Sequence, residues 1–234
     1  MKKNLNQKLI NLVEYYNLVN SNLVLENQPL KRMVNIKTTF SGKTRLQKLE
    51  KLKRDISLIK NCDLKRNAKN LVFADGNISS KIMIIGEGPG AQEDLRGIPF
   101  VGRAGKLLDK MLESINLDRK KVYISNVVNY RPPANRRPTE KEISRYLPYL
   151  INHIEIINPK ILILMGSTAL NTIVGTEEVI SKARGKWIKK GIGMAKPWVI
   201  ASFHPAFLMR QPEQKKLAWI DLKMVRDKIK ELKI

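Results

Sequence analysis

Four short apolar segments recur along the last two thirds of the chain, and stretches with helical spacing separate them. The apolar segments are Lys81–Ile85, Lys121–Val128, Lys160–Met165 and Pro197–Phe203. The helical stretches are Ala104–Ile115, Glu140–Ile157, a shorter one near Ala169–Val174, and Gln214–Leu232. Strands that alternate with helices form right-handed crossovers, so the pattern predicts an α/β fold whose parallel sheet is covered on both faces.

The first 58 residues do not follow this alternation. Residues 5–20 carry apolar positions at helical spacing, residues 21–45 resemble a linker, and Leu46–Leu64 predicts a strongly basic amphipathic helix. We therefore expect a helical N-terminal extension over residues 1–58 and one α/β domain over residues 59–234.

Composition points to a polyanionic partner. The chain has 234 residues with 44 basic and 21 acidic side chains, a net charge of +23. Such a surplus attracts nucleic acid first and an anionic membrane surface second, although a generally lysine-rich proteome would give the same excess.

No apolar run approaches the roughly 18 residues of a membrane span, and the basic N-terminus lacks the apolar core of a signal peptide. Cys62 is the single cysteine, which fits a reducing compartment and excludes an intramolecular disulfide.

Ligands of parallel sheets bind beyond the carboxyl ends of the strands, so the residues after each strand are the candidates for chemistry. The first such loop, Gly86–Gly90, reads GEGPG. It lacks both the GxGxxG pattern of dinucleotide sites and the Lys-Ser/Thr of a P-loop, which excludes those two readings. Its glycines let the backbone approach a ligand closely, although an ordinary strand-to-helix turn would use them too.

Two later loops carry polar side chains. The loop of residues 126–138 combines three prolines with three arginines, so it predicts a rigid, positive surface that could hold Asn126 against a base edge. His204 follows the last strand, where a catalytic group is expected, whereas His153 lies in a helical apolar pattern. The run Phe207–Met209 is either a helix start packed on the core or a wedge for a base stack.

Together these segments closely resemble the uracil-DNA glycosylase superfamily, and within it family 4. The matching segments are GEGPGAQED (86–94), GIPFVGRAGKLLD (97–109), VYISNVVNYRPPANRRP (122–138), NPKILILMG (158–166), RGKW (184–187) and FHPAFLMRQP (203–212). The resemblance implies a three-layer α/β/α sandwich with a central four-stranded parallel sheet. It also implies an enzyme that flips uracil out of DNA and hydrolyses its N-glycosidic bond.

The resemblance also assigns roles to single residues. Glu87 and Gly88 would position the attacking water, with Gly86 beside them in the uracil pocket, and Asn135 would orient water or phosphate. Phe100 would stack on uracil, Asn126 would read its polar edge, and His204 would hydrogen-bond O2, where negative charge grows. Glu93 would crowd the 5-methyl group of thymine. The expected DNA contacts and wedge residues are Arg136, Arg137, Phe207, Leu208, Met209 and Arg210.

One feature of the family is missing. Family-4 enzymes ligate a [4Fe–4S] cluster with four cysteines, and Cys62 matches one of those positions. Ile59, Tyr130 and Tyr146 occupy the other three, so we expect no iron–sulfur cluster and no metal. Aromatic packing would then fill the space, with Cys62 as a buried thiol.

The resemblance implies a monomeric, monofunctional enzyme of base-excision repair that acts on double- or single-stranded DNA. A bacterial cytoplasmic, nucleoid-associated location is expected. Alternatives are a glycosylase for another deaminated base, a catalytically inactive nucleic-acid-binding relative, and a relative that is trapped on its abasic product. The last class carries a His-bearing insert, and residues 131–140 contain no histidine.

Overall fold

The computed structural model describes residues 44–175 and 179–234, which all belong to one compact unit running from Gly42 to Ile234. The helix predicted within residues 5–20, and all but the last two residues of the linker predicted over 21–45, lie outside the described residues. The predicted domain boundary at residue 58 falls inside this unit, because Leu49, Leu52 and Ile56 are part of its hydrophobic core.

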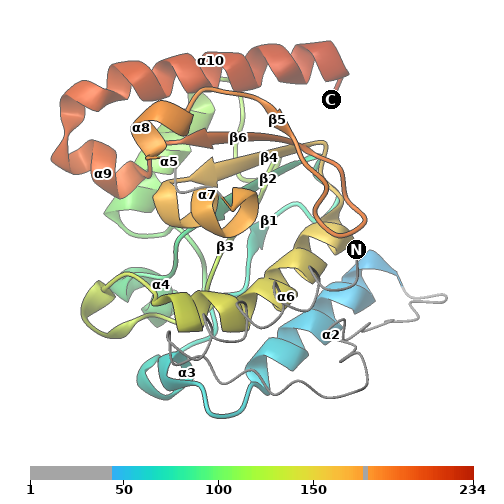
Figure 1. Ribbon diagram of the computed structural model, residues 1–234, viewed down its shortest axis with the longest axis vertical. Helices are drawn as coiled ribbons and strands as arrows, with labels where there is room; N and C mark the ends of the chain where they lie inside the picture. The colour runs from blue at the N-terminus through green and yellow to red at the C-terminus, as the bar shows by residue number, and fades with distance from the viewer. Residues whose placement is uncertain (1–43, 176–178) are drawn as a thin grey trace, which may run out of the picture. The chain divides into compact units, whose positions relative to one another are not determined.

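The elements follow in the order expected for an α/β fold (Figure 1). The helices are α2 (Arg45–Ser57), α3 (Asp63–Asn67), α4 (Ala91–Arg96), α5 (Arg103–Glu113), α6 (Glu140–Ile157), α7 (Ser167–Val174), α8 (Ile180–Ala183), α9 (Pro205–Arg210) and α10 (Lys215–Leu232), with short 3-10 turns at Pro133–Asn135 and Pro212–Gln214. The strands are β1 (Asp75–Gly76), β2 (Ile82–Gly86), β3 (Tyr123–Asn126), β4 (Ile161–Met165), β5 (Ile188–Lys189) and β6 (Trp198–Ser202).

The sheet has the order β1-β3-β2-β4-β6-β5. Its four central strands are parallel, which confirms the predicted parallel core of the fold. Two strands of two residues each, β1 and β5, add an antiparallel pair at either edge that the sequence pattern did not predict. Strands so short carry too few alternating positions to give a periodic signal.

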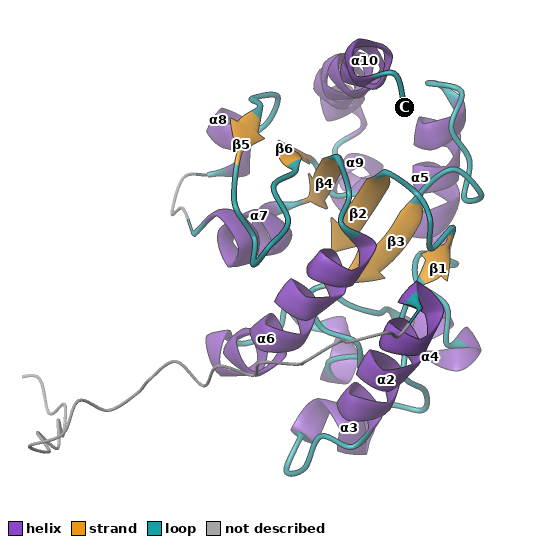
Figure 2. Cartoon of the chain, turned by 90° about the vertical axis from the view of Figure 1, so that its right-hand side faces the viewer, coloured by secondary structure: helices purple, strands orange, loops and turns teal. Residues whose placement is uncertain are grey.

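Figure 2 shows helices on both faces of the sheet. The buried strands send alternate side chains to opposite faces, and each face has its own core. On β2, Met83 and Ile85 pack beneath helices α2, α6 and α7, whereas Ile82 and Ile84 pack beneath α5, α9 and α10. The predicted three-layer α/β/α sandwich is therefore confirmed, with short mixed edges on its sheet. The described helices include none that is both long and apolar enough to span a membrane.

The basic helix predicted over Leu46–Leu64 is divided in two. Helix α2 ends at Ser57, and Asn61 then adopts a left-handed conformation with φ of 52° before α3 begins at Asp63. The break turns the chain so that Cys62 is buried against α6, where its thiol meets Tyr146. A tertiary contact thus overrides a continuous helical pattern.

Candidate functional site

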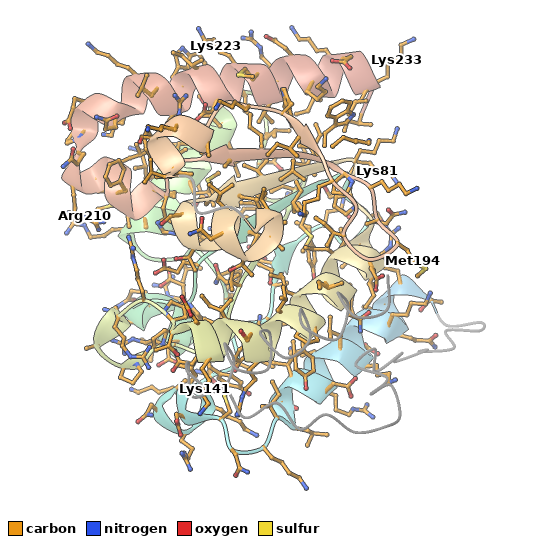
Figure 3. All side chains as sticks on the ribbon, in the orientation of Figure 1. Lys81, Lys141, Met194, Arg210, Lys223 and Lys233 are labelled. Atoms are coloured by element: carbon orange, nitrogen blue, oxygen red, sulfur yellow. The ribbon has the colours of Figure 1, made fainter. Side chains whose placement is uncertain are left out.

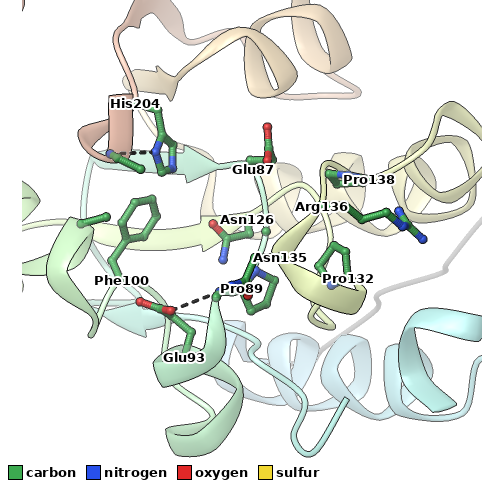
Figure 4. Close-up of a pocket in the computed structure, with 14 residues that line it drawn as sticks. Glu87, Pro89, Glu93, Phe100, Asn126, Pro132, Asn135, Arg136, Pro138 and His204 are labelled. Atoms are coloured by element: carbon green, nitrogen blue, oxygen red, sulfur yellow. Dashed lines mark hydrogen bonds between the residues drawn. The ribbon is translucent and has the colours of Figure 1, made fainter. Parts of the chain in front are cut away.

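A cavity of about 250 Å³ opens at the carboxyl ends of the central strands, where the sequence predicted a ligand (Figure 4). It brings together most of the predicted site residues, which come from separate loops of the chain. Its lining includes Glu87, Gly88, Glu93, Phe100, Asn126, Asn135, Arg136 and His204. Pro89, Pro132 and Pro138 stiffen its rim.

Asn126 ends strand β3 and points into this cavity (Figure 4). Its side chain is 3% exposed, and its Oδ1 atom is buried without a hydrogen-bond partner from the described part of the chain. A buried polar atom normally has a partner, because an unmet acceptor costs about 1–3 kcal/mol. This amide oxygen is therefore available to a donor on a ligand in the cavity.

Gly86 makes room for that ligand. It lies directly opposite Asn126 in the parallel pair of β2 and β3. A Cβ atom at this position would overlap both Asn126 Oδ1 and the tip of the Phe100 ring. The missing side chain thus keeps the amide and the aromatic face accessible, although Gly86 itself does not line the cavity.

His204 follows strand β6 and caps helix α9. Its Nδ1 atom accepts a hydrogen bond from the backbone N–H of Ala206 at 3.2 Å, so in the neutral ring Nε2 carries the proton. The pKa of His204 is lowered to about 4, mainly because burial disfavours the charged ring and secondly because Arg210 is positive, while Glu93 opposes the shift. At neutral pH the site therefore presents an uncharged N–H donor on the same cavity as Asn126.

Phe100 forms the wall beside His204, with its ring centroid 5.6 Å from the imidazole and the planes 31° apart. Glu93 also lines the cavity, from the first turn of α4. Its carboxylate accepts the backbone N–H groups of Gly90 at 3.1 Å, Val101 at 2.9 Å and Gly102 at 2.8 Å. Glu93 therefore lines the cavity and also holds the backbone of the loops on either side of α4. That Glu93 excludes the 5-methyl group of thymine stays a prediction.

Glu87 follows Gly86 and lines the cavity. The Thr168 hydroxyl donates a hydrogen bond to its Oε2 atom, and Arg137 Nε lies 4.0 Å from the same oxygen. Thr168 was not among the predicted residues. It lies in the first turn of α7, three residues after β4 ends at Met165. The expectation that functional residues follow the strands therefore indicated this region of the chain but did not identify Thr168 itself.

The arginine-rich loop is exposed and partly ordered by its own contacts. Asn135 has a left-handed backbone with φ of 55°, and its Oδ1 accepts a hydrogen bond from Arg131 Nε at 2.7 Å. Arg136 makes two hydrogen bonds to Glu142, and this pairing lowers the pKa of Glu142 to about 2. Arg137, with a side chain 75% exposed, is oriented outward.

The predicted wedge divides along helix α9. Leu208 is buried in the core that α5 and α10 share, so its predicted wedge role does not fit this structure. For Leu208 the alternative prediction, a helix start packed on the core, agrees with the structure. Phe207 lies against Phe203 with ring centroids 4.9 Å apart. Met209 is half-buried and Arg210 is exposed. Arg210 lies on the side of the molecule toward which β4 and β6 point (Figure 3).

The positions that carry cluster ligands in the family do not fit an iron–sulfur cluster here. Cys62 Sγ lies 3.3 Å from Tyr146 Oη, and Tyr130 is buried in the same core with Ile59 packed against it. Burial raises the pKa of both tyrosines, so their hydroxyls stay protonated. Across residues 44–175 and 179–234 no three His, Cys, Asp or Glu side chains are grouped to hold a metal.

Comparison with known proteins agrees with the geometry. The family model described as "Uracil DNA glycosylase superfamily" matches residues 73–223. A type-4 uracil-DNA glycosylase of Thermotoga maritima is 42% identical over 73% of this chain and 88% of its own length. Another, from Archaeoglobus fulgidus, is 38% identical over 77% of this chain and 92% of its own length.

Proposed function

Because the chain belongs to the uracil DNA glycosylase superfamily, and within it to the type-4 enzymes, we propose that it removes uracil from DNA in base-excision repair. It hydrolyses the N-glycosidic bond and leaves an abasic site. The observation that carries this assignment is the buried, unmet Oδ1 of Asn126 in a cavity that also holds Phe100 and a neutral His204.

Asn126 supplies base specificity. Its amide oxygen accepts the N3–H of uracil while its amide nitrogen donates to O4, and cytosine presents the opposite pattern at both atoms. Burial makes this test stringent, because a mismatched base would leave polar groups of the pocket unpaired. Phe100 gives the flipped base an aromatic face on which to stack.

His204 supplies the main electrostatic contribution. As the bond between the sugar and N1 breaks, positive charge develops on the sugar and negative charge on uracil O2. An uncharged Nε2–H donor aimed at that oxygen stabilises the departing anion, and a prearranged donor of this kind contributes about 10²–10³ in rate. DNA phosphates stabilise the sugar cation. Glu87 orients the water whose oxygen bonds to C1′, the water's proton is released, and N1 takes up a proton after departure.

DNA binds through exposed cations around the cavity mouth, above all Arg137 and Arg210. Its affinity falls steeply with salt, because each neutralised phosphate releases counterions. Single- and double-stranded DNA are both accepted, since the base is read only after extrusion. The enzyme acts as a monomer in the bacterial cytoplasm at the nucleoid, in keeping with its net charge of +23.

The enzyme works without an iron–sulfur cluster. At the positions that match the family's cluster ligands, Cys62 and Tyr146 form a buried hydrogen bond and Tyr130 packs in the same core, and none of these side chains lines the uracil cavity. Packing therefore takes over the stabilising role of the cluster, and the chemistry of the pocket is unaffected.

A strand-cleavage assay on a labelled duplex with one uracil tests the proposal. Alkali-labile breaks should appear with the wild-type protein and fall at least tenfold with His204→Ala, while DNA affinity stays nearly unchanged. A panel of duplexes carrying uracil, hypoxanthine or a thymine mismatch identifies the base. Cleavage of hypoxanthine alone would favour the related specificity, salt-sensitive binding without breaks would favour an inactive relative, and a covalent adduct with the product would favour the trapped class.

A further inference from the structure

Phe100, the aromatic wall of the uracil pocket, has an unusual backbone conformation. Its φ is 55°, in the left-handed region that bulky side chains rarely adopt. Such a strained conformation persists only where the surroundings hold it. The contacts of the loop 97–102 therefore show what fixes the ring.

On one side, Glu93 holds the N–H groups of this loop. Its Oε1 atom accepts the N–H of Val101 at 2.9 Å and that of Gly102 at 2.8 Å, immediately after Phe100. The carboxylate is tied to the start of its own helix through Gly90 N. The segment that follows Phe100 is thus anchored to α4.

On the other side, Arg119 holds the carbonyl groups. This residue precedes β3 and was not expected to take part in the site. Its guanidinium donates a hydrogen bond to the carbonyl of Pro99 at 3.0 Å and another to the carbonyl of Phe100. Four successive residues, 99–102, thus have a backbone group bound by either Glu93 or Arg119.

The guanidinium is itself fixed from two further elements. Arg119 Nε donates to Asp109 of α5 at 2.8 Å, and Nη1 donates to Asp75 of β1 at 2.7 Å. Helix α5 also approaches the loop so closely that a Cβ at Gly105 would overlap the Phe100 carbonyl. The group that holds Phe100 is therefore tied to the rigid part of the domain.

We propose that Arg119 is a positioning residue for base recognition, acting with Glu93 to set the plane of the Phe100 ring against the extruded uracil. The inference rests on the proposed function, because it concerns how that pocket is shaped. Without this clamp the loop can leave its strained conformation, and the ring then moves relative to His204 and the space above Gly86. Arg119 reaches the base only through Phe100 and touches no reacting atom.

A double-mutant cycle separates this role from a purely structural one. Arg119→Lys keeps a positive charge beside Asp75 and Asp109 but loses the planar fork that binds two carbonyls at once. It should lower the single-turnover excision rate at least tenfold. In a Phe100→Ala background the same substitution should change the rate less than twofold, because no ring remains to be positioned. An equal loss in both backgrounds, or no loss in either, would overturn the proposal.

Arg145→Lys is the matched control. Arg145 also donates to two successive loop carbonyls, those of Lys60 and Asn61, but it does not line the uracil cavity. It should lower the melting temperature while leaving the single-turnover rate within twofold of wild type. Should Arg119→Lys fail to fold, Asp109→Ala, which removes one support of the guanidinium, goes through the same cycle with a smaller expected loss.

A binding readout keeps this inference distinct from the proposed function. The wild type should bind a duplex with a non-cleavable 2′-fluoro-deoxyuridine more tightly than the matching thymidine duplex, and Arg119→Lys should lose most of that preference. A wild type with neither excision nor preference would refute the function itself. A wild type with both, alongside an Arg119→Lys protein that retains both, would refute only the clamp.

Discussion

Gly86 and Asn126 are direct partners across the parallel strands β2 and β3, and the space where a Gly86 side chain would lie is the space in front of the Asn126 amide oxygen. The same missing Cβ also leaves the Phe100 ring uncovered. A glycine is needed at this position because a side chain would overlap Asn126 and Phe100. The φ angle of Gly86 is outside the left-handed region and does not itself require glycine. Any side chain at position 86 would therefore press on the Asn126 amide and the Phe100 ring, the two groups expected to contact the base.

Gly86→Ala should abolish uracil recognition while the protein still folds. The added methyl group overlaps the amide and the ring that contact the base, so kcat/KM should fall at least 100-fold in a uracil excision assay. Since the backbone at this position is ordinary for an L residue, the circular dichroism spectrum should remain that of the wild type.

Gly191→Ala is the matched control for this substitution. No heavy atom lies within 4 Å of a Cβ built there, and its φ is outside the left-handed region. Its kcat/KM should stay within twofold of the wild-type value. A Gly86→Ala enzyme with normal kcat/KM would show that the base does not occupy the space between Asn126 and Phe100.

The uncharged state of His204 should be visible in the pH dependence of catalysis. Because desolvation lowers its pKa to about 4, the ring keeps its Nε2–H and no charge from pH 5 to 8. The single-turnover rate should therefore show no inflection near the ordinary histidine pKa of about 6.5. His204→Gln, which retains a neutral N–H donor, should keep more of the rate than His204→Ala. A rate that rises on protonation near pH 6.5 would instead require a charged imidazolium.

Protein stability should respond to pH through both histidines. Burial lowers the pKa of His153 to about 3 and desolvation lowers that of His204 to about 4, whereas both are about 6.5 in the unfolded chain. At pH values between the folded and unfolded pKa values, the unfolded chain binds more protons than the folded protein. The free energy of unfolding should therefore fall as pH drops below about 6.5, and it should level off above pH 7. Two such groups give a slope of up to about 2.7 kcal/mol per pH unit.

His153→Gln separates the two contributions. His153 is fully buried between Phe73 and Tyr123, and the Tyr123 hydroxyl lies 2.8 Å from its Nε2 atom, a partner that Gln can keep. Urea unfolding between pH 5 and 6.5 should then show about half the wild-type slope. This window lies above the range where Glu142, with its pKa lowered to about 2, takes up a proton. An unchanged slope would mean that His153 is already protonated when folded.

The sequence predicted elements best where local and tertiary preferences agree. Helix α6 begins at Glu140 and ends at Ile157 as its periodicity indicates, because Thr139 and Glu142 form a capping box at its start and Asn158 ends it in a left-handed conformation. The helix expected over Leu46–Leu64 instead breaks, because burial of Cys62 against Tyr146 decides its course. Such a contact between residues 84 positions apart leaves no local signal.

The site shows the same division. The predicted strand ends marked His204, which follows an apolar segment, and Asn126, a polar residue close to the end of another. Arg119 and Thr168 escaped notice because their importance comes from partners distant in sequence, the Pro99 carbonyl and the Glu87 carboxylate. A lone arginine before a strand looks like any other surface cation until its contacts are known.

Helix α9 should separate into a structural and a DNA-binding residue. Leu208→Ala removes a buried side chain and should lower the free energy of unfolding by about 2–5 kcal/mol.

Arg210→Ala should leave stability nearly unchanged but weaken DNA binding and reduce the slope of log K against log salt by about 0.9. Arg226, which pairs with Asp227 on α10, gives a matched control, because Arg226→Ala should affect that slope less. An unaltered salt slope for Arg210→Ala would remove this residue from the DNA interface.

The last prediction concerns the iron–sulfur positions. The purified enzyme should contain no iron and show no absorbance band of the iron–sulfur type, and Cys62→Ala should keep full excision activity, since the thiol lies outside the uracil cavity.

Tyr146→Phe loses only the hydroxyl that contacts Cys62 and should cost about 0.5–1.5 kcal/mol of stability. Tyr146→Ala leaves a cavity in the core and should cost about 3–5 kcal/mol, as large aromatic truncations do. The ordering of these three variants tests whether packing replaces the cluster, because a thiol that bound metal would make Cys62→Ala the most damaging change. Iron that copurifies in stoichiometric amount would contradict the prediction directly.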